Sequence, residues 1–127
     1  MITIVVAAAI IERDGRFLIT KRQKGVHLEG YWEFPGGKCD PGETIARCLA
    51  RELREELDVD ALVGEEVFAT SHTYPDRIVE LHFLECRVIG EPRPQLGQEM
   101  RWAARDELSA LAFPPADGEL IRRLTGC

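Results

Sequence analysis

The chain begins with an almost uninterrupted apolar run from Ile2 to Ile11 that is rich in β-branched residues. The run is too uniformly apolar for a strand with one face in water, so we expect a strand covered on both faces inside an α/β sheet. Asp14-Gly15 is a strong hairpin signal, and Arg16 to Lys21 is the natural return strand. Because the run lacks a basic n-region and continues into Glu12-Arg13, it does not resemble a signal peptide, and we expect a cytoplasmic protein.

The length and the charge of the chain restrict its function further. Its 127 residues can build one core, and we expect a single domain over residues 1–127. No apolar run is long enough to cross a bilayer, so the sequence predicts no contact with a membrane. The formal net charge of -6 is unfavourable for binding a nucleic-acid polymer through its phosphates. An acidic chain that handles anions would need metal ions.

Four cysteines, Cys39, Cys48, Cys86 and Cys127, lie far apart in the chain without a C-x-x-C pair. This spacing offers neither a zinc site nor a thioredoxin-type motif. We therefore expect all four to be reduced thiols, as is usual in the cytosol.

The rest of the chain predicts a mixture of helices and strands. Five glycines and two prolines make Gly25 to Gly42 mostly loop, with at most a short strand. Thr44 to Leu57 is the clearest helix, because Ile45, Leu49 and Leu53 recur at a spacing of four. The other expected elements are strands at 67–74, 78–89 and 101–103 and a helix from about residue 115 to 124. We expect a mixed sheet with helices on both faces.

Three carboxylates gather on one face of the expected helix. Glu52 lies one turn from both Glu55 and Glu56, away from the apolar stripe. Like charges at this spacing repel unless a cation intervenes, and Mg²⁺ is a cation that prefers oxygen ligands. The glycines of Gly36-Gly37-Lys38 favour such a site, because they let the backbone approach a metal or phosphate. The alternative is a solvated helix face whose glutamates are neutralised by Arg47, Arg51 and Arg54.

Residues 37–59 read GKCDPGETIARCLARELREELDV. This stretch resembles the signature of the Nudix hydrolases, G-x5-E-x7-R-E-U-x-E-E-x-G-U, in which U is an aliphatic residue. The matching positions are Gly37, Glu43, Arg51, Glu52, Leu53, Glu55, Glu56 and Val59. The one departure is Asp58 in place of glycine, and Asp is among the few other residue types that tolerate the left-handed conformation of a helix end.

Further segments resemble the MutT-like branch of this family, the 8-oxo-dGTP diphosphatases. They are residues 21–22, 32–38, 74–77 and 113–117. The resemblance implies a Nudix-type α/β/α sandwich and a Mg²⁺-dependent hydrolase, with Mn²⁺ as another possible metal. Such an enzyme cleaves a nucleoside triphosphate between its α and β phosphates, and it works as a monomer or homodimer.

The resemblance also assigns roles to individual residues. The Gly36 carbonyl, Glu52 and Glu56 would hold the metal. Glu55 would be a further ligand or orient bound water, and Arg51 would fix the carboxylates by charge-assisted hydrogen bonds. The implied substrate-binding residues, with Arg22 on a phosphate, are Arg22, His27, Glu33, Phe34, Pro35, Gly36, Lys38, Tyr74, Arg77 and Asp117.

Two departures from the MutT-like pattern leave alternatives open. Leu96 occupies the position of an extra glutamate, so either Glu99 substitutes after a shift of the loop or Glu52 acts as the base unaided. Asp117 occupies the position of an asparagine that reads the base. An ionised carboxylate accepts a hydrogen bond from the amino group of cytosine or adenine, and a protonated one can also bind guanine. The other alternative is that Asp117 only caps the last helix.

These alternatives leave three candidate functions. Hydrolysis of 8-oxo-dGTP is the favoured one, and hydrolysis of (d)CTP or a modified pyrimidine nucleotide is the second because of Asp117. A non-catalytic nucleotide-binding module is the third. The intact set of Arg51, Glu52, Glu55 and Glu56 disfavours this third candidate, since a pure binder would not need them.

Overall fold

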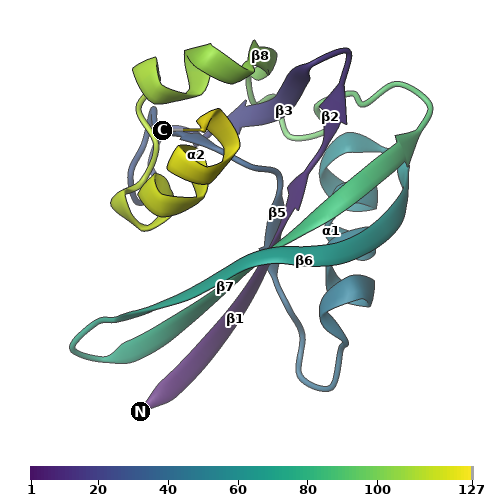
Figure 1. Ribbon diagram of the computed structural model, residues 1–127. Coiled ribbons are helices and arrows are strands. Elements are labelled where there is room, and N and C mark those ends of the chain that lie inside the picture. The colour runs from purple at the N-terminus through teal and green to yellow at the C-terminus, as the bar shows by residue number, and fades with distance from the viewer. Residues whose placement is uncertain (127) are drawn as a thin grey trace.

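A computed structural model describes residues 1–126 of the chain. Two sheets and two α-helices are arranged as Figure 1 shows. The strands are β1 Ile2–Ile10, β2 Glu12–Arg13, β3 Arg16–Lys21, β4 Trp32–Glu33, β5 Gly36–Lys38, β6 Asp60–Thr73, β7 Arg77–Ile89 and β8 Met100–Ala104. The helices are α1 Ile45–Leu57, α2 Gly118–Thr125 and the 3-10 segments η1 Arg105–Ala110 and η2 Pro115–Asp117.

The first sheet is mixed and is built around β1. Its strand order is β5-β1-β7-β6, with β1 parallel to β7 and antiparallel to β5. As predicted, the second half of β1 is covered on both faces, because Ala7 and Ala8, which point to opposite faces, are 0% and 7% exposed. The prediction is wrong for the first half, where Ile2 is 70% exposed. The reason is that β1, β6 and β7 extend beyond both α-helices (Figure 1).

The second sheet is antiparallel, with the order β2-β3-β4 and β8 on the other edge of β3. Asp14 and Gly15 form the predicted hairpin turn, both with a positive φ, as the tight turn requires. We predicted one mixed sheet, but the described strands form two sheets because the chain leaves the first sheet after Ile10.

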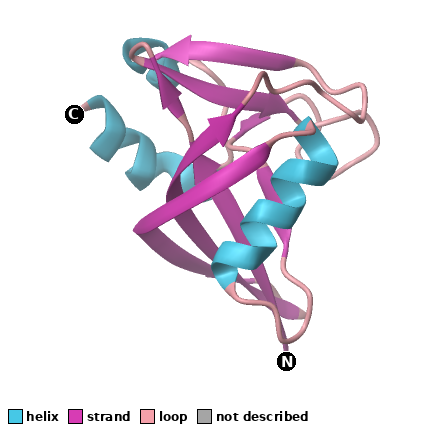
Figure 2. Cartoon of the chain, turned by 90° about the vertical axis from the view of Figure 1, so that its right-hand side faces the viewer, coloured by secondary structure: helices cyan, strands magenta, loops and turns pink. Residues whose placement is uncertain are grey.

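Alternation along the strands divides the interior into two cores. On β3, Phe17 and Ile19 join the core under α2, whereas Leu18 joins the core under α1. Figure 2 shows α1 across the near face of the sheets, with the C-terminal helix on the far side. The predicted α/β/α sandwich with helices on both faces is therefore confirmed.

Two elements differ from the sequence prediction. β6 begins at Asp60, well before the predicted Val67, and its register with β7 shifts at Glu66. The polar stretch around Glu66 concealed this strand because a bulge interrupts the apolar alternation. The segment η1 was not predicted, and the Glu107 carboxylate helps to hold its start by accepting from the Ala104 amide at 2.8 Å. No helix of residues 1–126 is long and apolar enough to span a membrane.

The prediction of reduced cysteines is wrong for one pair. Cys39 and Cys48 form a disulfide, with their Cα atoms 5.1 Å apart. Their separation of nine residues conceals this contact, since the loop between β5 and α1 has to fold back to make it. Cys86 is a free, buried thiol, and Cys127 lies outside the described residues.

Candidate active site

Helix α1 begins and ends as its sequence predicts. The Thr44 side chain accepts a hydrogen bond from the Arg47 amide at 3.2 Å, which caps the first turn. Asp58 ends the helix in the left-handed conformation, with φ 54°, that was expected where the signature has glycine. The apolar stripe is buried against the sheets, and the charged face beside it carries Glu52 and Glu56 next to the β5 backbone.

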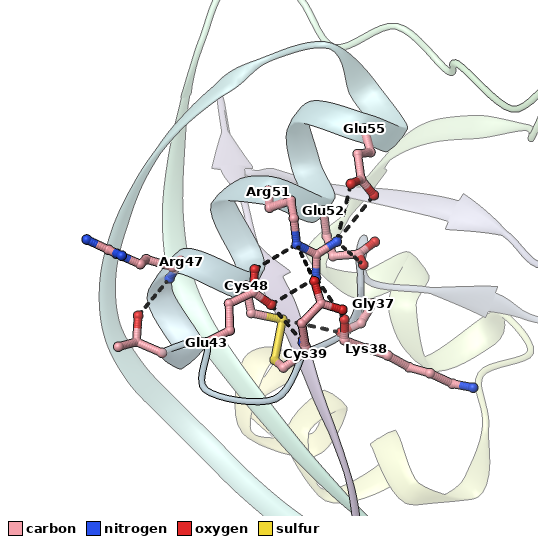
Figure 3. Close-up of polar contacts among 11 residues, drawn as sticks. Gly37, Lys38, Cys39, Glu43, Arg47, Cys48, Arg51, Glu52 and Glu55 are labelled. Atoms are coloured by element: carbon pink, nitrogen blue, oxygen red, sulfur yellow. Dashed lines mark hydrogen bonds and ion pairs between the residues drawn. A yellow bond between two sulfur atoms is a disulfide. The ribbon is translucent and has the colours of Figure 1, made fainter.

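Arg51 joins the charged face of α1 to the loop that precedes it (Figure 3). Its Nε and Nη2 atoms donate to the two carboxylate oxygens of Glu43 at 2.7 and 2.9 Å. Its Nη1 atom donates to Glu52 at 3.0 Å and to Glu55 at 3.3 Å, and Nη2 also reaches the Lys38 carbonyl at 3.0 Å. One guanidinium therefore orients three carboxylates and a backbone carbonyl.

The carboxylates on Arg51 have different protonation preferences. Hydrogen bonds from Arg51 lower the pKa of Glu43 to about 2, so this group stays ionised. Burial raises the pKa of Glu52 above its usual range, although Arg51 partly opposes the shift. Glu43 is thus a fixed anionic anchor for Arg51, and Glu52 is the carboxylate that is held in a drier position.

Glycines make room for the carboxylates in front of α1. A Cβ atom on Gly37 would lie 2.4 Å from the carboxyl group of Glu52. A Cβ atom on Gly36 would lie 1.9 Å from the Ala7 carbonyl oxygen, and Gly36 has a positive φ of 157°. The glycine pair is therefore required by packing at this corner, and it brings the β5 backbone close to Glu52.

Glu56 is the most perturbed carboxyl group on this face. Burial, together with the nearby charges of Glu52 and Glu33, raises its pKa to about 8. A hydrogen bond from the Gly36 backbone acts in the opposite direction. The crowding of negative charge around Glu56 is the condition that a bound cation would relieve.

The donor chemistry of this corner fits a hard divalent cation. Within residues 1–126, no three His, Cys, Asp or Glu side chains already form a metal cluster. The charge of Glu52 nevertheless helps to raise the pKa of Glu56, and the Gly36 backbone lies beside Glu56. Carboxylate and carbonyl oxygens are the ligands that Mg²⁺ and similar ions prefer.

A cleft of about 600 Å³ opens beside this corner. One wall is apolar and comes from β1 and β7, with Val6, Val79 and Leu81 among its residues. Glu56 lies in the polar part of the lining. The predicted substrate-binding residues that line the cleft are Arg22, His27, Glu33, Phe34, Gly36, Lys38, Tyr74, Arg77 and Asp117.

Pro35 is the one predicted substrate-binding residue outside this lining. It is fully buried, and its carbonyl accepts from the Ala9 amide at 2.8 Å. The neighbouring Phe34 lines the cleft and also stacks on Phe113, with ring centroids 5.3 Å apart. Sequence reasoning missed the apolar wall residues, although the recurrence of Val79 and Leu81 at period two along β7 is a signal that could have found part of the wall.

Arg22 and Glu33 form an ion pair in the cleft. Arg22 Nη1 lies 2.6 Å from Glu33, and Arg22 Nε donates to the His27 carbonyl at 2.6 Å. Burial raises the pKa of Glu33, and Arg22 opposes the shift. The pair thus places one cation and one acceptor close to Glu56.

Asp117 does not act as a helix cap. It lies at the start of α2, but its side chain makes no capping hydrogen bond. The residue is only 6% exposed and lines the cleft. Burial, followed by the charge of Glu33, raises the pKa of Asp117 to about 7. This carboxyl group is available to a bound molecule and exists in both protonation states near neutral pH.

Tyr74 and Arg77 lie at the turn between β6 and β7. The Arg77 guanidinium lies over the Tyr74 ring at 4.8 Å, and His72 packs edge-on against the same ring at 4.6 Å. Both Tyr74 and Arg77 line the cleft. Ring and guanidinium therefore support one another at the far end of the cleft from α1.

A segment before β8 closes the end of α1. The Gln95 amide and the Gln98 side chain donate to the Glu56 carbonyl at 2.9 and 3.3 Å. The Arg93 amide donates to the Leu57 carbonyl at 2.9 Å. The sequence offers no signal for this role of Gln98, because a glutamine in a polar loop is ordinarily exposed.

The segment before β8 also determines which side chains lie near Glu56. Leu96 and Gln98 line a smaller cavity of about 140 Å³ together with Glu56. Glu99 is absent from that lining, and its carboxylate lies 4.0 Å from Lys21 in solvent. In this arrangement the loop shift that would bring Glu99 to the carboxylates has not occurred, which leaves Glu99 as a charged loop residue.

A carboxylate-bearing helix, the Gly36-Gly37 corner and an adjoining cleft are typical of the metal-assisted hydrolases as a class. A family model described as the NUDIX domain matches residues 6–123, and the chain belongs to the Nudix hydrolase family. Hydrolases of this family generally use divalent metal ions.

Two of the similar proteins are named for different activities. The chain is 42% identical over 121 residues to an 8-oxo-dGTP diphosphatase of Haemophilus influenzae, covering 94% of this chain and 89% of the relative. It is 38% identical over 117 residues to a CTP pyrophosphohydrolase of Escherichia coli, covering 91% and 87%. The solution structure of the E. coli ORF135 protein matches with a TM-score of 0.88 and 37% identity, over 99% of this chain and 91% of that one.

Proposed function

We propose that the protein is a Mg²⁺-dependent nucleoside triphosphate pyrophosphohydrolase of MutT type. Its substrate would be an oxidised purine nucleotide such as 8-oxo-dGTP, which it converts to the monophosphate and pyrophosphate. Such a reaction would keep oxidised nucleotides out of DNA replication. The observation that carries the proposal is the cleft of about 600 Å³, whose lining includes Glu56 of the carboxylate face.

The metal would be held by the Gly36 carbonyl, Glu52, Glu55 and Glu56, with Mn²⁺ as a possible replacement for Mg²⁺. When bound, the cation neutralises the triphosphate, polarises a P–O bond and lowers the pKa of an attacking water. Arg51 keeps Glu52 and Glu55 oriented for this task through its hydrogen bonds.

The rest of the cleft would bind the nucleotide. Lys38 and Arg22 would supply positive charge near the phosphates, and Glu33 would hold Arg22 in place at 2.6 Å. Phe34 and Tyr74 would contact the base through their rings. Because Asp117 is buried in the cleft without a capping bond, it would read polar groups on the base.

The second candidate substrate is (d)CTP or a modified pyrimidine nucleotide. An ionised Asp117 accepts from the exocyclic amino group of cytosine, as acidic side chains do elsewhere. The similarity to a CTP pyrophosphohydrolase favours this candidate as well. A protonated Asp117 can instead both donate and accept, which suits the O6 and N7–H groups of 8-oxoguanine.

Pyrophosphate release from a panel of triphosphates in Mg²⁺ tests the proposal. We expect release with 8-oxo-dGTP as the best substrate and a loss of at least 100-fold in Glu52→Gln. The exposed Glu65→Gln, outside both cavities, is the matched control. Nucleotide binding without release would favour the non-catalytic module, and undiminished release in Glu52→Gln would contradict the assigned role of the carboxylates.

Base preference is measured separately with Asp117→Asn. A gain for 8-oxo-dGTP relative to CTP would assign base reading to Asp117. A preference unchanged between the two nucleotides would remove Asp117 from base recognition.

We also propose that the enzyme works on free nucleotides in the cytoplasm as a monomer or homodimer. The net charge of -6 supports a role away from nucleic-acid polymers and anionic membrane surfaces. Light scattering on the purified protein measures its mass, and a trimer or larger assembly would contradict this part of the proposal.

A further inference from the structure

The Cys39–Cys48 disulfide closes the loop that leads into α1. Cys39 follows the last residue of β5, and Cys48 lies in the first turns of α1 (Figure 3). Nine positions separate them in sequence, and their Cα atoms are 5.1 Å apart. The bond therefore ties the glycine corner directly to the carboxylate-bearing helix.

The closed loop carries the anchor of Arg51. Glu43 lies inside the loop and accepts two hydrogen bonds from Arg51, at 2.7 and 2.9 Å. Arg51 also donates at 3.0 Å to the carbonyl of Lys38, which is the residue before Cys39. A change in the mobility of this loop would thus act on Arg51 and, through it, on Glu52.

The surroundings of the two sulfur atoms accommodate a reduced pair as well. Cys48 is fully buried in the apolar core under α1, where a thiol packs as a small hydrophobic group. Its Sγ atom lies 3.8 Å from the Gly37 carbonyl, which can accept from an S–H group. Cys39 is only partly buried, so a small oxidant can reach it.

Cys86 offers a contrast within the same protein. It is buried, and the absence of water around it raises the pKa of its thiol to about 11. Cys86 also has no disulfide partner among the described residues, so it cannot complete the intramolecular exchange that a second cysteine allows. Of the three cysteines among the described residues, the pair at the loop is the one built for reversible chemistry.

We infer that Cys39 and Cys48 form a reversible dithiol–disulfide site that regulates the stiffness of the Arg51-anchoring loop, residues 40–47. The inference deepens and rests on the proposed function, because the loop supports the carboxylates assigned to the metal. Oxidation locks the loop in its present conformation, and reduction loosens it. The proposed substrate is itself an oxidation product, so conditions that generate it also favour the locked enzyme.

The chemistry requires a disulfide oxidant such as oxidised glutathione. The Cys39 thiolate attacks one sulfur of the oxidant, and the first reduced glutathione leaves. The Cys48 thiolate then attacks the Cys39 sulfur of this mixed disulfide and displaces the second. The two cysteine protons end on the two departing glutathione thiolates, so two cysteines are oxidised and one molecule of oxidised glutathione is reduced to two of reduced glutathione.

Peptide mapping tests the pairing in the full chain, equilibrated at a series of glutathione ratios. Trypsin cuts after Lys38, Arg47 and Arg51, so the oxidised pair links peptide 39–47 to peptide 48–51. We expect this linked species to appear reversibly as the ratio rises. Linkage to Cys127 instead, or free thiols at every ratio, would overturn the inference.

Thermal unfolding tests the consequence for the loop. A disulfide that closes a loop of this length should raise the midpoint of thermal unfolding, so that it is roughly 5–15 °C higher in oxidised than in reduced protein. Cys39→Ser removes the difference, Cys39→Ala repeats the test without a hydroxyl group, and Cys86→Ser is the matched control that retains it. Equal midpoints in oxidised and reduced wild-type protein would refute the regulatory role.

A final comparison separates this inference from the proposed function. Mapping and unfolding need no substrate, so they succeed or fail whatever the protein hydrolyses. If the protein releases pyrophosphate, we expect this activity to survive several-fold longer in oxidised than in reduced wild-type protein. The half-life of the activity is measured near the unfolding midpoint of the reduced protein. The same half-life in both redox states would show that the disulfide stabilises the fold without protecting the site.

Discussion

At the scale of single residues, the cleft contains a carboxyl group in a position that penalises its charge. Asp117 is 6% exposed, faces the charge of Glu33 and is only partly relieved by Arg22. Its ordinary pKa of 3.8 is raised to about 7 in the folded protein. The folded state therefore binds this proton more tightly than the unfolded state does.

The raised pKa predicts how stability depends on pH. Its contribution is fully present below about pH 3.8 and is lost as the pH rises through about 7. Asp117→Asn removes this titration, so at pH 8 the variant should be more stable than wild type by roughly 2–4 kcal/mol, and near pH 4 it should not be. Urea unfolding in a metal chelator measures this.

Glu119→Gln, an exposed change on the same helix, is the control for that experiment. An Asp117→Asn variant that is less stable than wild type by the same amount at both pH values would mean that the carboxyl group makes a favourable contact in both charge states.

At the scale of elements, the sequence predicted what depends on neighbours in the chain. The periodicity of α1, its left-handed end at Asp58 and the Asp14-Gly15 turn are local, and the structure confirms all three. The Cys39–Cys48 bond, nine positions apart, and the contact of Gln98 with the end of α1, 42 positions apart, both depend on how a loop folds back. Such contacts leave no local pattern, since they form only when loops fold back.

The same distinction applies to the candidate site. The signature predicts that Glu52, Glu55 and Glu56 share a helix face, because helix geometry alone brings them together. It does not predict that Glu33 from β4 raises the pKa of Glu56, since that contact requires the packing of the second sheet against α1. Carboxylates on one helix are predictable from spacing, and the groups that tune them are not.

The link between the β5–α1 loop and α1 should be sensitive to acid. Hydrogen bonds from Arg51 lower the pKa of Glu43 from 4.5 to about 2, so their stabilising effect is present above about pH 4.5 and is lost as the pH falls toward 2. Glu43→Gln should unfold at a lower temperature than wild type at pH 7, and the two midpoints should converge in acid. Calorimetry at pH 7, 4 and 2.5 measures this.

Glu43→Gln should also reduce pyrophosphate release by about 10–100-fold, the usual effect of removing a group that orients metal ligands. Glu65→Gln serves as the control in both measurements. A constant difference in midpoint at every pH would mean that the ionised carboxylate of Glu43 is not what Arg51 holds.

At the scale of the whole molecule, a chain of net charge -6 concentrates part of its acidity on one helix face. The carboxylates of this face lie beside the β5 backbone. A cation bound between them would therefore hold together two elements that are separate in the unfolded chain. Metal binding should therefore stabilise the fold as a whole, by an amount that mass action sets. The acidity that repels a triphosphate then becomes the means of binding one through cations.

Mg²⁺ at about 100 times its dissociation constant should add about 2.7 kcal/mol to the free energy of unfolding and raise the midpoint by roughly 10 °C. A chelator should reverse the shift. Sodium chloride at matched ionic strength is the essential control, because screening alone relieves repulsion in an acidic protein. Glu52→Gln should lose most of the Mg²⁺ shift and keep the small response to sodium, since only the specific site depends on that carboxylate. If sodium reproduces the Mg²⁺ shift in wild-type protein, the helix face is a solvated acidic surface, and the metal assignment fails together with the hydrolytic mechanism that needs it.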